Sequence, residues 1–61
     1  MEFEITLTAK TTDEGGLKKS FEDQLAELGG TATLVSQVPP YRVETSDGFF
    51  FEAQRTYNIV L

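Results

Sequence analysis

The residues best suited to chemistry are concentrated in one stretch, YRVETSDGFFFEA, which runs from Tyr41 to Ala53. This stretch combines aromatic rings with an arginine, and two kinds of recognition use that combination. The bases of single-stranded nucleic acid stack on aromatic rings beside cationic side chains. Protein interfaces use the same residue types as anchors inside a polar rim. The choice between them depends on which rings face solvent and what surrounds them.

Catalytic residues are scarce in this chain. It contains no histidine and no cysteine, which excludes a thiol nucleophile, a histidine-based triad and a typical zinc site. Asp13, Glu14 and Asp47 are candidates for a pair of catalytic carboxylates, but nothing in their spacing brings them together in a pocket. We therefore predict that the protein is not an enzyme and that it uses no cofactor and no metal.

The turn after Thr45 decides which face each aromatic ring occupies. A two-residue loop at Asp47-Gly48 would place Val43 opposite Glu52, which mixes charged and apolar residues on both faces. A three-residue loop, with Gly48 in the left-handed region as part of a bulge, instead places Val43 opposite Phe51. We favour the three-residue loop because it makes one face of the hairpin apolar.

The favoured register sends Phe50 to the face opposite the core, while the phenylalanines on either side of it face inward. Arg42 and Glu44 then share the face of Phe50, whereas Tyr41 joins the core side. The assignment depends on Gly48 adopting the three-residue turn. The predicted partner-binding residues are Phe50, Val60, Arg42 and Glu44.

The other segments alternate between strand and helix patterns. Met1 to Lys10 alternates apolar and polar residues, as expected for a strand with one wet face. Leu17 to Leu28 repeats leucine and phenylalanine at helical spacing, and Gly29-Gly30 ends this amphipathic helix. Thr31 to Val38 is rich in β-branched residues and predicts a second strand. Pro39-Pro40 must interrupt its ladder, because neither residue has an N–H to donate.

The end of the chain poses a length problem. A strand from Phe49 to Leu61 would span about 43 Å at the usual rise of ~3.3 Å per residue, which is long for so small a sheet. We therefore predict a bulge or bend near Gln54 to Thr56, followed by a continuing or separate strand. This last segment is also expected to present an open edge, since it contains few charges and no proline.

Together these elements predict a single α+β domain over residues 1–61, in the order β-α-β-β with a possible fourth strand at the end. One amphipathic helix packs on one face of a curved, mostly antiparallel sheet. The first two strands are joined through the helix, so we expect them to be parallel, either adjacent or with another strand between them. The residues expected on the helix-covered face are Phe3, Ile5, Leu7, Val43, Phe49, Phe51, Tyr57 and Ile59.

Length and charge limit the choice of partner. A chain of 61 residues can bury only a small core, so self-association is a reasonable expectation. Ten acidic and five basic residues give a net charge of -5, which disfavours nucleic acid and attracts basic partners. No apolar run approaches the ~20 residues of a membrane helix, and the lack of cysteine fits a reducing compartment. We expect a cytoplasmic protein that does not enter membranes.

The sequence thus favours a non-enzymatic protein-interaction module, such as a small regulator or inhibitor that occludes the surface of a partner protein. A homodimer is compatible with this function. One alternative is a homo-oligomeric structural protein whose only interface is with itself. The other is a single-strand nucleic-acid binder that uses the sheet face. The acidic side of the helix is a further candidate surface, formed by Glu22, Asp23 and Glu27.

Overall fold

The computed structural model describes all 61 residues and contains one helix and one three-stranded sheet. The elements are β1 (Glu2–Thr11), α1 (Gly16–Leu28), β2 (Thr31–Thr45) and β3 (Gly48–Val60). The strand order is β1-β3-β2, and β3 is antiparallel to both neighbours. The predicted α+β class is confirmed. The strands β1 and β2 run parallel to each other with β3 between them, which was one of the two arrangements expected.

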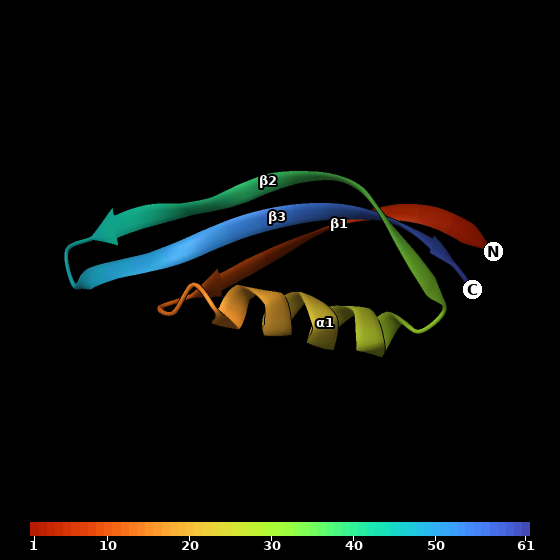
Figure 1. The fold of residues 1–61 in the computed structure, drawn as a ribbon, viewed down its shortest axis with the longest axis horizontal. Helices are drawn as coiled ribbons and strands as arrows, with labels where there is room; N and C mark the ends of the chain where they lie inside the picture. The colour runs from red at the N-terminus through yellow and green to blue at the C-terminus, as the bar shows by residue number, and fades with distance from the viewer.

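The molecule is elongated, with extents of 43 × 18 × 16 Å. Its length follows from the strands, since β3 runs from one end of the molecule to the other (Figure 1). The helix α1 lies along one face of the sheet, and the hairpin that joins β2 to β3 extends beyond it. At the other end the two termini are adjacent, because the Leu61 N–H donates to the Met1 carbonyl oxygen at 2.8 Å. The helix therefore covers only part of the sheet.

The helix packs through the stripe that the sequence predicts. Leu17 and Phe21 are buried, and Leu25 and Leu28 are partly buried against the same core. Spacing of three or four residues places these side chains on one side of the helix. The opposite side is charged and carries two ion pairs at i,i+4 spacing, Lys18 with Glu22 and Lys19 with Asp23. Exposed pairs of this kind add only a few tenths of a kcal/mol, so the apolar stripe holds the helix in place.

Two glycines make the connection from the helix to β2. Gly29 and Gly30 both have a φ of 73°, and the Gly29 N–H donates to the Leu25 carbonyl oxygen at 3.2 Å. A side chain at Gly30 would overlap the carbonyl oxygen of Val60. The predicted helix end at this glycine pair is confirmed, and Gly30 also allows β2 to start directly against the end of β3.

The core lies between α1 and the strands β1 and β3. Phe21 and Ile59 are its largest fully buried side chains. Arg55 borders this core, with its guanidinium carbon 4.7 Å from the centre of the Phe21 ring. It also donates from Nη1 to the Tyr57 hydroxyl at 3.2 Å. The seven buried residues are Leu7, Ala9, Leu17, Phe21, Ala53, Tyr57 and Ile59.

The hairpin turn differs from both predicted loops. Thr45 pairs with Gly48, so the loop consists of Ser46 and Asp47 alone. Neither loop residue has a positive φ, which excludes the primed turns that need one, and Gly48 takes up the unusual backbone with a φ of 141°. The three-residue loop is therefore wrong, as is the Asp47-Gly48 loop.

The new register changes the predicted core. Val43 lies opposite Phe50, not Phe51, so it belongs to the open face of the sheet and not to the helix-covered face. Phe49 lies on the helix side but is 41% exposed, because the helix ends before the hairpin. Only Phe51 of the two inward phenylalanines contacts the core, and it is partly buried.

The irregularities predicted in the last strand lie in β2 instead. Between Phe51 and Val60, β3 pairs with β1 without any register shift. In β2, Val35 is an extra residue between two paired ones, and Pro39-Pro40 together face a single β3 position. The strand therefore continues through the proline pair as a bulged strand. Because β3 is central, the end of the chain is not an open edge, and that prediction is wrong.

Candidate interaction surface

The strand β2 is the least covered element of the fold. The helix packs on β1 and to a smaller extent on β3. Every residue of β2 except Val43 is exposed. Since β2 is also an edge strand, one of its backbone sides has no neighbour. Its large apolar side chains with high exposed fractions are Leu34 at 45%, Val35 at 54%, Val38 at 46% and Tyr41 at 40%.

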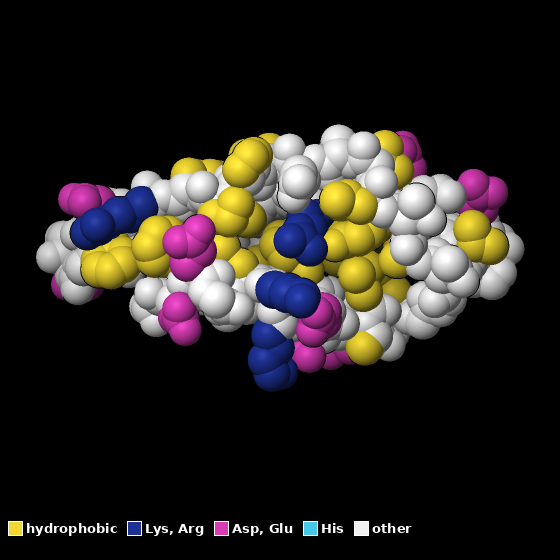
Figure 2. Space-filling model, viewed as in Figure 1, with side chains coloured by type: hydrophobic (Ala, Val, Ile, Leu, Met, Phe, Trp, Pro, Cys, Tyr) yellow, Lys and Arg dark blue, Asp and Glu magenta, His cyan; other side chains and the backbone are white.

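The second uncovered region is the hairpin tip, which we define as residues 41–51. The pairing of β1 with β3 stops at Thr11 and Phe51, so the sheet has only two strands beyond that point. The helix does not extend over this end (Figure 1). In the space-filling view, hydrophobic and basic side chains lie together at this end of the molecule (Figure 2). The tip contains four aromatic residues, Tyr41, Phe49, Phe50 and Phe51.

On the open face of the sheet, the tip presents Phe50 and Val43 opposite each other, both half-buried. The Lys10 ammonium lies 5.7 Å from the centre of the Phe50 ring. Lys10 also lies 3.6 Å from the carboxylate of Glu52, which accepts a hydrogen bond from the Tyr41 hydroxyl. This hydrogen bond raises the pKa of Tyr41 above its ordinary value, because ionisation would remove the donated proton. A small apolar patch is thus bordered by a fixed polar network.

On the helix side, the tip presents a second aromatic group. The rings of Phe49 and Phe51 meet edge to face, with centres 5.7 Å apart. The Arg42 guanidinium carbon lies 4.0 Å from the centre of the Phe49 ring, and its Nε lies 3.4 Å from Glu44. Such stacking holds both the ring and the guanidinium in defined positions.

The four predicted partner-binding residues do not form one surface. Phe50 points to the open face as predicted, and Val60 lies on the same face of the same strand. At the ordinary strand rise, however, Val60 is about 33 Å from Phe50, so the two cannot share a contact patch. Arg42 and Glu44 lie opposite Phe51 and Phe49 and therefore occupy the helix side.

The turn places Arg42 and Glu44 on the face opposite to Phe50, because a one-residue difference in register moves each nearby β2 side chain to the other face. Phe50 keeps its direction for an independent reason. The long pairing of β1 with β3, in which Ala9 lies opposite Ala53, fixes the faces of β3 without reference to the turn. The outward Phe50 thus survives, although the turn from which it was derived is wrong.

Sequence reasoning missed three neighbours of Phe50, which are Tyr41, Val43 and Lys10. The expected register places the first two on the core side, but the structure places both on the open face. Lys10 reaches Phe50 diagonally from the adjacent strand β1, where it lies opposite Glu52. Tyr41 and Val43 change face because the turn is one residue shorter than expected, since no register shift lies between Tyr41 and the turn.

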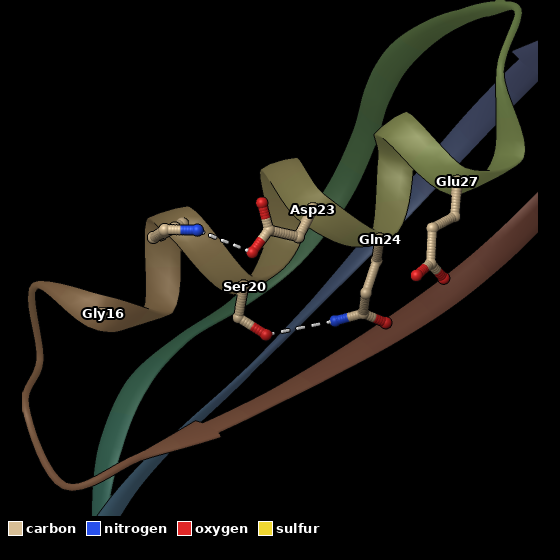
Figure 3. Close-up of a pocket in the computed structure, with 6 residues that line it drawn as sticks. Gly16, Ser20, Asp23, Gln24 and Glu27 are labelled. Carbon is tan, nitrogen blue, oxygen red and sulfur yellow. Dashed lines mark hydrogen bonds and ion pairs between the residues drawn. The ribbon is translucent and has the colours of Figure 1, made fainter.

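A polar hollow of about 300 Å³ lies along α1 (Figure 3). It has no hydrophobic lining residue, and four of its side chains pair with one another. Lys19 pairs with Asp23 at 2.9 Å, and Gln24 donates to the hydroxyl of Ser20 at 3.4 Å and to the carbonyl of Thr8 at 3.1 Å. All six lining residues come from α1, so the hollow resembles the solvated side of a helix more than a ligand site. No group of three or more acidic residues gathers anywhere to hold a metal ion.

The single helix is too short and too polar to cross a membrane. Comparisons with protein-family models, curated proteins and solved structures find no match to this chain.

Proposed function

We propose that the chain is a non-enzymatic protein-interaction module that binds a partner protein through the hairpin tip. It would act as a small regulator or inhibitor by covering part of that partner's surface. One observation carries the proposal: Phe49 and Phe50 lie beyond the last residue pair of β1 and β3, where the sheet has two strands and the helix does not reach, and Tyr41 and Phe51 lie at the border of this region. The cysteine-free chain suits a reducing compartment such as the cytoplasm.

The chemistry of the tip fits a binding hot spot. Aromatic residues and arginine dominate the energy of protein interfaces, especially where they form a compact group. Phe49 is 41% exposed and Tyr41 is 40% exposed, so both retain apolar area for a partner to bury. Arg42 stacks on Phe49, and Tyr41 is hydrogen-bonded to Glu52. Side chains already held in place lose less entropy on binding, which favours affinity.

Charge indicates the kind of partner. The net charge of -5 attracts a basic protein surface over several ångströms and speeds its association. Glu44 and Asp47 place part of this charge at the tip itself. We therefore expect a partner with an apolar pocket bordered by lysine or arginine, and binding that weakens as salt is raised.

The same aromatic residues make single-strand nucleic acid the second candidate. Its phosphates would meet Glu44, Asp47 and Glu52 around the rings, and the chain as a whole is acidic. We expect no binding to a labelled random single strand at low salt, measured by fluorescence anisotropy. Saturable binding in that assay, lost in Phe50→Ala, would replace the protein partner with nucleic acid.

Capture of the partner from a lysate of the source organism tests the proposal. We expect Phe49→Ala and Phe50→Ala to lose the protein that the unchanged chain captures, while circular dichroism still shows a folded domain. Val60→Ala is the matched control, because Val60 is 46% exposed on the same sheet face at the far end of β3. Capture that survives both tip variants and is lost with Val60→Ala would move the binding surface away from the tip.

A further inference from the structure

We infer that a second copy of this chain pairs with the free edge of β2 along residues 31–38, forming a continuous six-stranded sheet. This surface is separate from the hairpin tip, so the inference goes beyond the proposed partner binding. It starts from the state of the two sheet edges. Of these, β1 is closed by its surroundings and β2 is open.

The edge of β1 carries features that oppose pairing. Gln24 of α1 donates to the carbonyl oxygen of Thr8, so a helix side chain binds the backbone of this strand. Glu2, Glu4 and Lys10 add charges along the same strand. Covering side chains and charges are the usual means by which edge strands avoid other strands.

The edge of β2 has none of these features between Thr31 and Val38. That segment, TATLVSQV, contains no charged residue, although the chain as a whole has a net charge of -5. At its centre Leu34 is 45% exposed and Val35 is 54% exposed. Pro39-Pro40 follows directly and interrupts a ladder on the free edge, because neither residue has an N–H to donate, and Arg42 and Glu44 add charges beyond it. The open edge is therefore limited to eight residues.

Pairing of two such edges is constrained by their faces. In an antiparallel pair related by a two-fold axis perpendicular to the sheet, directly opposed residues must lie on the same face. A regular strand meets this condition only when the numbers of two opposed residues sum to an even value. One residue then lies opposite its own copy at the axis. The extra residue Val35 reverses the alternation of faces between residues 31–34 and residues 36–38. Residues from the two halves therefore share a face when their numbers sum to an odd value.

With this bulge, a self-pairing centred between Leu34 and Val35 matches the faces of the three outer pairs, whose members all have partners in β3. Thr33 and Ser36 both lie on the open face, opposite Asn58 and Thr56 of β3. Ala32 and Gln37 both lie on the helix side, opposite Ile59 and Arg55, and Thr31 and Val38 both lie on the open face. In this arrangement the central contact is Leu34 with the partner's Val35, and both side chains are exposed. The segment is thus self-complementary in face and in polarity.

The dimer has a defined architecture. Its strand order is β1-β3-β2 followed by β2-β3-β1 of the second copy, and both helices lie on the same face. An edge contact of eight residues is small beside the roughly 1,600 Å² of standard interfaces, so we expect it to dissociate on dilution. Since both chains are acidic, salt should strengthen this dimer, the opposite of its effect on a basic partner.

Cysteine cross-linking tests the register directly, because the natural chain has no cysteine. Opposed residues in an antiparallel pair lie within the Cα range of a disulfide. We expect Thr33→Cys mixed with Ser36→Cys to give a disulfide-linked heterodimer under mild oxidation, far in excess of what either variant forms alone. Equal yields from the mixture and from Thr33→Cys alone would overturn the register.

Solution mass provides the second arm. From low micromolar to millimolar concentration, we expect the unchanged chain to shift from monomer to dimer, and Leu34→Lys to remain monomeric. Val60→Lys is the control and should dimerise normally, because Val60 is exposed on the central strand. A natural chain that stays monomeric throughout would overturn the inference. Partner capture by Leu34→Lys should persist, so failure of the dimer and failure of the tip are distinguishable.

Discussion

Two regions of this molecule differ in how far the helix covers them, and we call them the covered side and the uncovered side. On one side, β1 and β3 pack against α1 and contain all the strand residues of the buried core. On the other side, β2 and the hairpin tip hold most of the exposed aromatic and branched side chains. The first side supplies stability, while the second leaves apolar surface available to other molecules. A chain this small cannot cover its whole sheet with one helix, and the uncovered part is where binding can occur.

The largest effect should come from the covered side. Phe21 is 1% exposed at the centre of the core, so Phe21→Ala should cost about 3 to 5 kcal/mol of unfolding free energy. That approaches the whole stability of a domain of this size. We expect the variant to be unfolded at room temperature by circular dichroism. A cooperative transition close to that of the natural chain would place the core elsewhere.

A smaller loss is expected where α1 connects to β2. Gly30→Ala should lower the unfolding free energy by about 2 kcal/mol or more, because its Cβ would overlap the Val60 carbonyl and its φ is 73°. Gly29→Ala is the matched control, with the same φ and open space around the new methyl group, and should cost less, about 1 to 3 kcal/mol for the strained backbone alone. Urea denaturation measures both. Equal losses would show that the contact with Val60 is unimportant.

Sequence reasoning could predict much of the covered side and little of the uncovered one. Alternation in β1 and the leucine stripe of α1 are local patterns, and the structure follows both. The faces of β3 also follow from alternation, which is why the prediction for Phe50 was right. The faces of β2 depend on the turn and on two bulges, each of which adds one residue to the count. Arg42 and Glu44 lie between the second bulge and the turn, so the turn alone fixes their faces, and local patterns could not predict its length.

Loss of a phenylalanine ring should cost much less stability on the uncovered side than on the covered side. Phe50→Ala should cost only about 1 kcal/mol of unfolding free energy, far less than Phe21→Ala, because Phe50 is half-buried at an uncovered end. Urea denaturation of the two variants gives the difference. A loss of several kcal/mol at Phe50 would mean that the tip belongs to the core.

The smallest effect concerns the polar network of the tip. The bond from Tyr41 to Glu52 raises the pKa of Tyr41 above its ordinary value of 10.0, so it stabilises the fold below that pH. This stabilisation is lost as pH rises through the raised pKa. In a Tyr57→Phe background, phenolate absorbance should show Glu52→Gln returning the pKa of Tyr41 toward 10.0. An unchanged titration would show that the bond does not persist in solution.

Amide hydrogen exchange in dilute solution, resolved by residue, tests the comparison most directly. The account predicts slow exchange in α1 and in the amides that join β1 to β3. Within residues 31–38, fast exchange is expected at the alternate amides that face the free edge. It is also expected in the part of the hairpin tip that has no β1 neighbour, residues 42–50. Raising the protein concentration should protect residues 31–38 and leave the tip unchanged. Uniform protection of β2 in dilute solution, equal to that of β3, would contradict the division into a covered and an uncovered side.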